Sequence, residues 1–359
     1  MKLFKKITVL LLLAPFILAA NTVKKHEKSK TISRSFKVNS NATVYIKNKY
    51  GNVNVTTWDK NQVEIDVKIT VKGKDVDKVA QKLNAIKIEF ESTSSLVEAR
   101  TIIESVRSGW SWWGSKNNLN YQINYFVKMP VTNNADLNNK YGNIELDILE
   151  GKANINCDYG SIEVEKLLNA SNAISLDYCG NSEIRYMKSG TISADYSKIT
   201  VDKAENLKVN ADYTAVKLGE MGDLNFNCDY GSIAVNDVVN AIGNSDYAGM
   251  RFGTIRKNLK VGTDYGGLRI KNLAKGFESV SIDSNYAGVK IGTSSDNSFS
   301  FTVNLSYASF NYPSDYIEMF KSIKKTTSKY YEGNFGKGNS DSKISIRSDY
   351  GGVSLKLND

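Results

Sequence analysis

The chain has 359 residues, and its 47 lysines and arginines against 38 aspartates and glutamates give a formal net charge of +9. Acidic and basic residues are interspersed without a basic stripe, which argues against a nucleic-acid partner and makes solubility the simplest meaning of the charge. The three cysteines, Cys157, Cys179 and Cys228, are an odd number and exclude a complete disulfide framework. We expect thiols in the core, because free cysteine behaves as a small hydrophobe.

Residues 1–20 have the pattern of a secretory signal peptide. Three lysines fall within the first six residues, an apolar run follows over residues 7–18, and Ala19-Ala20 offers a small-residue cleavage site. The apolar run is short for a bilayer span, and no later stretch approaches the length of a transmembrane helix. We therefore expect an exported protein without a transmembrane segment, located in the periplasm, at the outer membrane or outside the cell.

Residues 21–130 read as an α+β cap region that also holds the first copy of a repeat. Alternating apolar residues over 63–69 predict a strand, and Asp75 is placed to cap a helix whose apolar face runs from Val76 to Leu83. Further strands are expected over residues 86–90, 96–103 and 121–127. Such a cap would cover the open sheet edge at the N-terminal end of a repeat array.

A tryptophan-rich loop is expected inside this region, over residues 108–115. Trp110, Trp112 and Trp113 are bracketed there by glycine and serine. Large apolar rings at a loop tip are often used for binding, by stacking on glycans or entering a membrane interface. Packing of these rings against the cap is an equally good interpretation, and the sequence leaves the two open.

A recurring phrase, Asp-Tyr-Gly-x-apolar-x-apolar, dominates the rest of the chain, residues 131–359. Most of its tyrosines fall 17 to 21 residues apart. A fixed period of this size predicts stacked units, each too small to bury a core of its own. The twelve motif tyrosines are Tyr50, Tyr141, Tyr159, Tyr178, Tyr196, Tyr213, Tyr230, Tyr247, Tyr265, Tyr286, Tyr307 and Tyr350.

Each copy reads as two short strands joined by a bend. Ile155, Cys157 and Tyr159 alternate with polar residues, and after Gly160-Ser161 the apolar phase shifts to Ile162 and Val164. Stacking such copies predicts an all-β fold, a parallel β-solenoid with rungs of 17–21 residues. Right-handed winding is the default for parallel crossovers.

The strand phase places the tyrosine rings inside the solenoid. We expect a structural ladder of stacked rings as its axial support, in preference to a sugar-binding aromatic stripe on the surface. The ladder would include Tyr159, Tyr196, Tyr213, Tyr230, Tyr247, Tyr265, Tyr286 and Tyr307.

Aspartates directly before the tyrosines form a second, outward-facing row. Stacked carboxylates would repel one another unless hydrogen-bonded, paired or metal-bound. Capping of each following bend is favoured over a row of calcium sites, which would use Asp195, Asp212, Asp229 and Asp246. The single histidine, His26, gives no support to another metal site, and we expect no cofactor.

An excursion from the repeat is expected over residues 313–340. Residues 315–325 have the spacing of a short amphipathic helix, followed or overlapped by the lysines Lys321, Lys324 and Lys325. Most such clusters are solvated surface, and contact with an anionic partner is the alternative.

The chain resembles a known family at several points. The leader, the segment Val127-Lys128-Met129-Pro130, and the phrases Lys-Tyr-Gly-Asn-Val and Asp-Tyr-Gly-Ser-Ile are similar to the adhesin-like β-strand-repeat family of exported Bacteroidota envelope proteins. The resemblance covers most of the mature chain. It implies a β-solenoid in the cell envelope, and it transfers no catalytic residues.

Two functions remain open from the sequence. The favoured one is a non-enzymatic surface or envelope scaffold that binds a glycan, an envelope polymer or a surface protein, in an unspecified oligomeric state. The alternative is a polysaccharide lyase or hydrolase, which needs two converging carboxylates, or a base with arginine and calcium. Carboxylates occur here at periodic scaffold positions, and the irregular insertions are aromatic or basic.

Overall fold

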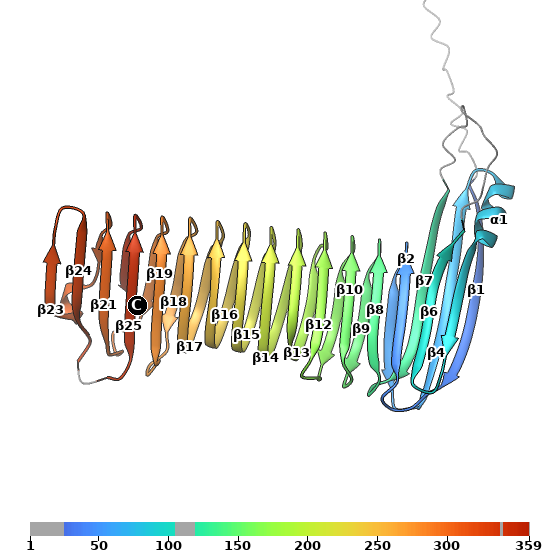
Figure 1. The fold of residues 1–359 in the computed structure, drawn as a ribbon, viewed down its shortest axis with the longest axis horizontal. Coiled ribbons are helices and arrows are strands. Elements are labelled where there is room, and N and C mark those ends of the chain that lie inside the picture. The colour runs from blue at the N-terminus through green and yellow to red at the C-terminus, as the bar shows by residue number, and fades with distance from the viewer. Residues whose placement is uncertain (1–24, 105–118, 338–339, 359) are drawn as a thin grey trace, which may run out of the picture.

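The computed structural model describes residues 25–104, 119–337 and 340–358. They form an elongated stack of strand pairs, with helix α1 (Val76–Ala85) at one end and a β-hairpin at the other (Figure 1). The strands belong to one long, mostly parallel sheet, which confirms the predicted all-β class. No helix within the described ranges is long and apolar enough to cross a membrane. The expected signal peptide of residues 1–20 lies outside the described residues.

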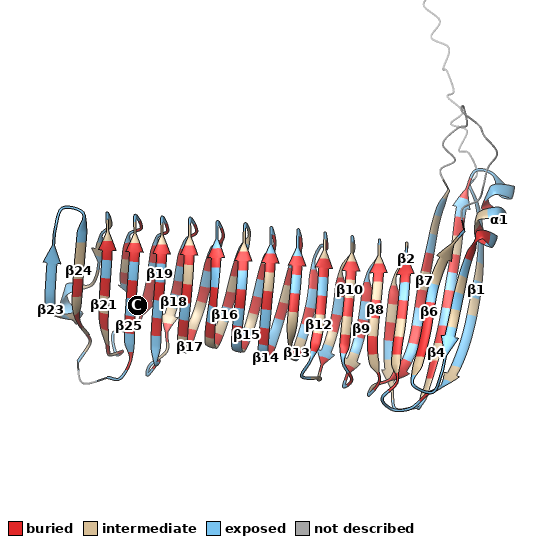
Figure 2. Cartoon of the chain, viewed as in Figure 1, coloured by how far each residue is buried: buried red, intermediate tan, exposed pale blue. Residues whose placement is uncertain are grey.

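One turn of the stack consists of β10 (Ala153–Asp158), a corner at Tyr159 and β11 (Ile162–Leu167). Ile155 and Cys157 are buried on the first strand, and Ile162 and Val164 on the second. Along β10 buried residues alternate with half-buried ones, and banding of this kind recurs along the stack (Figure 2). The predicted shift of phase at the corner is therefore confirmed.

Neighbouring turns pair in parallel on both sides of the corner. Strand β10 lies between β8 (Asn134–Lys140) and β12 (Asn172–Asp177). Strand β11 lies between β9 (Ile144–Leu149) and the first part of β13 (Ser182–Asp195). The core is the continuous column of apolar residues enclosed by these turns.

Five long strands make the middle of the stack, because the second strand of one turn runs on into the first strand of the next. Each ends at the aspartate before a motif tyrosine. They are β13, β14 (Lys198–Asp212), β15 (Ala215–Asp229), β16 (Ser232–Asp246) and β17 (Gly249–Asp264).

Shorter strands continue the stack on either side of this middle part. Towards the N-terminal end they are β2 (Thr43–Lys49) and β3 (Val53–Trp58). Towards the other end they are β18 (Leu268–Leu273), β19 (Ser279–Asn285), β20 (Val289–Thr293), β21 (Phe299–Ser306) and β22 (Phe310–Asn311).

Antiparallel strands and one helix cover the N-terminal end. Strand β4 (Gln62–Gly73) pairs with β1 (His26–Lys37) and β7 (Asn120–Pro130), and β5 (Ile86–Ser92) pairs with β6 (Leu96–Ile103). The Asp75 carboxylate caps α1 by accepting hydrogen bonds from the backbone N–H groups of Asp77 and Lys78. The helix is thus confirmed, although Val76 is 40% exposed and does not belong to its buried face.

The last turn in sequence is not the last turn in space. Strand β25 (Lys343–Asp349) inserts between β19 and β21, and β26 (Val353–Leu357) inserts between β20 and β22. The chain therefore passes to the end of the stack, turns back, and fills the position beside it.

A hairpin forms the C-terminal edge, and here the prediction of a helix over residues 315–325 is wrong. A short 3-10 turn, Ser314–Tyr316, leads into strand β23 (Ile317–Lys324), which pairs with β24 (Ser328–Phe335). Strand β24 in turn pairs with β21 and so covers its edge. Tertiary pairing wins over the helical spacing: Ile317 and Met319 pack against the core, while Phe320 is 59% exposed.

Candidate binding site

Every motif tyrosine sits at a sharp corner of the backbone. All twelve have a positive φ, between 48° and 67°. This left-handed conformation interrupts the strand alternation, so the corner residue points outward where a strand residue would point inward. The prediction of buried rings is therefore wrong: the rings from Tyr141 onward are 42% to 61% exposed.

The rings nevertheless form a stacked ladder. Consecutive ring centroids from Tyr159 to Tyr286 are 4.8 to 5.1 Å apart with planes within 6° of parallel, and Tyr350 then lies between Tyr286 and Tyr307. Because each face covers the next, solvent meets ring edges and hydroxyls. A sugar stacks on a free ring face, and the rings within the ladder have both faces covered by neighbouring rings. These tyrosines therefore hold neighbouring turns together and do not provide a glycan-binding surface.

The residue after each tyrosine is small and helps to close the corner. A Cβ on Gly160 would lie 2.1 Å from the backbone oxygen of Gly142 in the preceding turn. Where the position holds a hydroxyl, as in Thr214, that hydroxyl donates to the Asp212 carbonyl at 2.8 Å. The Ser197 hydroxyl donates to the Asp195 carbonyl at 2.7 Å in the same way.

The aspartate row works across turns and does not cap the bends, which corrects the favoured prediction. Asp229 Oδ1 accepts the N–H of Asp246 at 3.1 Å, and Asp264 Oδ1 accepts the amide of Asn285 at 2.8 Å. Burial, and then the neighbouring carboxylates, raise the pKa of Asp212 and Asp246. Among the described residues no group of three histidine, cysteine or acidic side chains could hold a metal ion, so the calcium row gains no support.

The lysines of the C-terminal excursion lie on the exposed hairpin. Lys321 Nζ is 5.4 Å from the ring centroid of Tyr330, and Lys324 Nζ is 5.9 Å from that of Tyr331. Lys321 and Lys325 line a shallow hollow of about 390 Å³ that also contains an acid, Asp349. The structure thus brings two of the three predicted lysines together. Trp110, Trp112 and Trp113 lie outside the described residues.

A larger groove lies on the outer face of the stack, along the segments that directly follow the corner tyrosines. These segments are the first parts of β15, β16 and β17, together with β18 and β20. Its volume is about 1060 Å³. All the charged residues that line it are basic: Lys217, Arg251, Arg269, Lys271 and Lys290. We call these five residues and the space between them the basic groove.

Strand register places the basic residues in one line. Successive turns align Lys217 with Ala234, Ala234 with Arg251, Arg251 with Arg269, and Arg269 with Lys290. Strands in a sheet are about 4.8 Å apart, so the charges are spaced at that interval or at twice it along the stack. We call the whole line of aligned positions, starting with Glu145, the outer row.

The floor of the groove is backbone, because small residues separate the charged ones. Gly249, Gly267 and Gly288 line it, with Ala234 in the outer row itself. A Cβ on Gly249 would meet nothing within 4 Å, and one on Gly267 would first meet a backbone oxygen at 4.0 Å. The space above these glycines is therefore open to a ligand.

The outer row changes sign along the molecule. In the N-terminal turns it holds Glu145, Glu163 and Glu183. Arg185 joins two of these acids with Glu165 into a network, 3.9 Å from Glu163 and from Glu183 and 3.1 Å from Glu165. None of the five groove residues forms an ion pair with the described part of the chain. The basic groove is therefore a surface of uncompensated positive charge.

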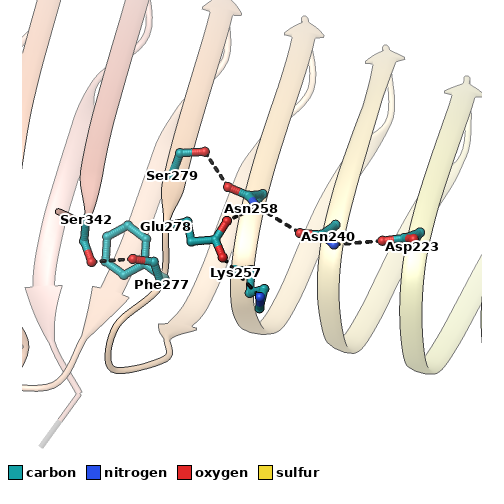
Figure 3. A network of polar contacts seen from close by, with 8 residues as sticks. All are labelled: Asp223, Asn240, Lys257, Asn258, Phe277, Glu278, Ser279 and Ser342. Carbon is teal, nitrogen blue, oxygen red and sulfur yellow. Dashed lines mark hydrogen bonds and ion pairs between the residues drawn. The ribbon is translucent and has the colours of Figure 1, made fainter.

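A row of polar side chains at another bend of the turns forms hydrogen bonds and an ion pair within itself (Figure 3). Asn240 donates to Asp223 at 2.8 Å, and Asn258 donates to Asn240 at 3.0 Å and to Glu278 at 2.8 Å. Glu278 also pairs with Lys257 at 3.1 Å. These groups bond to one another across turns, so this row holds the bend together, whereas the charges of the basic groove have no such partners.

The basic groove was not recognised from the sequence. Four of its five basic residues occur four positions after Tyr213, Tyr247, Tyr265 and Tyr286, which are strand positions that face solvent. At that one position of the repeat every acid precedes Thr200 and every base follows it. The information was present in the chain, but the change of sign becomes a site only when the turns are stacked in register.

Comparisons with known proteins find matches among solved structures alone. A scan against protein-family models finds no match, and a search of the curated proteins finds none either. Solved structures do match, among them a candidate adhesin from Parabacteroides distasonis ATCC 8503, with 10% identity, TM-score 0.34, and coverage of 91% of this chain and 97% of that one.

Two further structures match over similar lengths. A candidate cell adhesion protein from Clostridium sporogenes ATCC 15579 has 11% identity, TM-score 0.19, and coverage of 92% of this chain and 100% of that one. A candidate lipid binding protein from Parabacteroides distasonis ATCC 8503 has 9% identity, TM-score 0.33, and coverage of 90% and 96%. Identity and TM-score are both low, so these likenesses carry no argument about the function of this chain.

Proposed function

We propose that this chain is a non-enzymatic protein of the cell envelope or cell surface, whose rigid solenoid binds an acidic polysaccharide in the basic groove. The observation that carries the proposal is the line of unpaired basic residues with no acid among the residues that line the groove. Opposite charges along an extended partner would compensate them at several turns at once.

An acidic polysaccharide suits the groove better than a nucleic acid does. Single-stranded nucleic acids are held by bases stacked on exposed aromatic rings as well as by charge. The one aromatic residue that lines the groove, Phe252, is buried. A polymer that carries a carboxylate or sulfate on each sugar needs only charge, backbone and small residues along its path, which is what the groove provides.

Binding without cleavage is favoured by the chemistry of the lining residues. Glycoside hydrolysis uses a pair of carboxyl groups on either side of the bond, and the lining residues include none. A lyase would use a basic residue together with a bound cation that neutralises the uronate, and a cation site needs converging oxygens. Arg251 and Arg269 would serve such a reaction, so product formation is the outcome that would favour a lyase.

The finer architecture belongs to the same proposal. We propose a right-handed solenoid with rungs of 17–21 residues over residues 131–359, interrupted by the excursion of 313–340 and preceded by a cap region of 21–130. Export by a signal peptide of residues 1–20 would place the solenoid in the periplasm, at the outer membrane or outside the cell. A long, straight stack suits a binding scaffold because it keeps charges at fixed intervals.

The test is binding of polygalacturonate to the full mature chain, measured by titration calorimetry, with neutral dextran as the reference polymer. The double variant Arg251→Glu/Arg269→Glu should bind at least about tenfold more weakly, a loss of about 1.4 kcal/mol or more. The matched control is Lys208→Glu/Lys260→Glu, which makes the same charge change on exposed residues of the turns that carry Lys217 and Arg269, on the other strand of each.

Three outcomes would contradict the proposal. Equal loss of affinity in both double variants would show that binding depends on the net charge of the protein and not on the basic groove. Tighter binding to single-stranded DNA or to anionic lipid vesicles than to polygalacturonate would assign another partner. Release of unsaturated or reducing ends from the polymer would make the protein an enzyme.

A further inference from the structure

The corner of each turn brings two positions of neighbouring turns into contact. The side chain directly after one tyrosine reaches the residue two positions before the tyrosine of the preceding turn. Thr214 Oγ1 donates in this way to the carbonyl oxygen of Ala194 at 2.9 Å. Cys179 Sγ has the same relation to the carbonyl oxygen of Cys157, at 3.0 Å.

In this one corner both positions are cysteine. Cys157 and Cys179 lie on consecutive turns, since β10 and β12 pair in parallel with Cys157 opposite Leu176. Both side chains are buried, and both are thiols in this structure. A hydrogen bond between the two thiols raises the pKa of Cys157 and lowers the pKa of Cys179 to about 7. The Cys179 sulfur thus lies directly against the backbone of Cys157, in the corner that also buries the Cys157 side chain.

We propose that Cys157 and Cys179 are a disulfide-forming pair that staples two consecutive turns of the solenoid. A disulfide oxidant, such as oxidised glutathione or the disulfide of an oxidoreductase, accepts the two electrons and the two thiol protons. One sulfur–sulfur bond forms in the protein, and the bond of the oxidant breaks to give two thiols. Because the folded corner buries both sulfurs, the exchange takes place while the chain folds.

The third cysteine is excluded from this pair by its position. Cys228 lies three turns further along, two positions before Tyr230, and the residue directly after the tyrosine of the following turn is Ala248. Burial, followed by the nearby Asp229, raises the pKa of Cys228 to about 11 and so keeps it as an unreactive thiol. The odd number of cysteines thus resolves into one pair and one core thiol. This inference does not depend on the proposed binding function.

The test is a count of free thiols after the full mature chain refolds in a glutathione redox buffer. The refolded protein is denatured without reductant, treated with N-ethylmaleimide and analysed by intact mass. We expect one label, on Cys228, and a peptide pair linked through Cys157 and Cys179 in the unreduced digest. Three labels on the wild-type protein would overturn the proposal, and this result needs no variant to fold.

Two variants assign the labels. Cys228→Ala should take up no label and keep the linked peptides, because the pair is intact. Cys157→Ala should take up two labels, since Cys179 is left without its partner. A second readout is the melting temperature: added reductant should lower it in the wild type and in Cys228→Ala by the same amount, and leave it unchanged in Cys157→Ala. Two labels on Cys228→Ala would contradict the assignment.

Discussion

The acidic and the basic stretch of the outer row occupy the same position of the same repeat. Glu163 and Arg269 both follow their corner tyrosine by four residues, both lie on paired parallel strands, and both are exposed. They differ in what surrounds them. Glu163 and Glu183 share Arg185, while the bases face glycines and one another across an open floor. The fold therefore aligns the charges of successive turns. The neighbouring side chains decide whether those charges are neutralised within the protein or remain free to bind a partner.

Reversing the balancing arginine should give the largest effect on stability. In Arg185→Glu the acidic stretch loses its ion pairs with Glu163, Glu165 and Glu183 and gains a fourth carboxylate. Exposed pairs are worth about 0.2 to 1 kcal/mol each, so we expect the free energy of unfolding to fall by about 1 to 2 kcal/mol. Urea unfolding at low salt measures it, and an unchanged midpoint would show that the network does not stabilise the fold.

Filling the floor tests the groove by shape instead of charge. Gly267→Leu places a side chain in the open space between basic residues, and we expect affinity for polygalacturonate to fall about three- to tenfold, or about 0.7 to 1.4 kcal/mol, with little change in stability. Gly180→Leu is the matched control, because a Cβ there also meets nothing within 4 Å and the residue lies beside the acidic stretch. Undiminished binding by Gly267→Leu would place the ligand elsewhere.

The same Arg→Glu change in the basic stretch should have the opposite sign. In Arg269→Glu the new carboxylate lies between Arg251 and Lys290, so repulsion is replaced by attraction. We expect the free energy of unfolding to rise by up to about 0.5 kcal/mol at low salt, and the gain to shrink at high salt. Destabilisation equal to that of Arg185→Glu would remove the distinction between the two stretches.

A substitution in the aspartate row should have the smallest effect on the free energy of unfolding. In this row like charges are stacked without an arginine such as Arg185 to neutralise them. Burial and the neighbouring Asp229 and Asp195 raise the pKa of Asp212 above its value in the unfolded chain. When a carboxyl pKa is higher in the folded than in the unfolded chain, ionisation of that group destabilises the fold. The cost is complete above the folded-state pKa and disappears well below the unfolded-state pKa. Asp212→Asn should therefore stabilise the protein by a few tenths of a kcal/mol near neutral pH. The gain should vanish near pH 3, and a gain that persists there would have another cause.

Much of the architecture could be predicted from the period and the alternation of apolar residues. Ile155, Cys157, Ile162 and Val164 point inward as expected, because strand residues obey the period-2 rule. Tyr159 does not, because its left-handed corner lies outside the strand and turns the ring outward. Local alternation cannot show a corner conformation that non-glycine residues adopt rarely.

Two other differences arise from contacts that are distant in sequence. The spacing of residues 315–325 favours a helix in isolation, but pairing of β23 with β24 makes a strand of it. Strand β25 inserts between β19 and β21, which are separated from it in sequence. The motif at Tyr350 predicts one more turn but does not show where in the stack that turn lies. The residues of the basic groove were missed for the same reason, since their charges form a line only when the turns are stacked.

Locating the bound polymer on the protein tests whether the basic groove is its binding site. Polygalacturonate is incubated with the mature chain and a carbodiimide, which joins its carboxylates to lysines in contact, and the modified lysines are identified by mass spectrometry. We expect modification at Lys217, Lys271 and Lys290, well above that at Lys208 and Lys260, which lie on the other strand of the turns of Lys217 and Lys271. Even modification of all exposed lysines, or a preference for Lys321, Lys324 and Lys325, would contradict it.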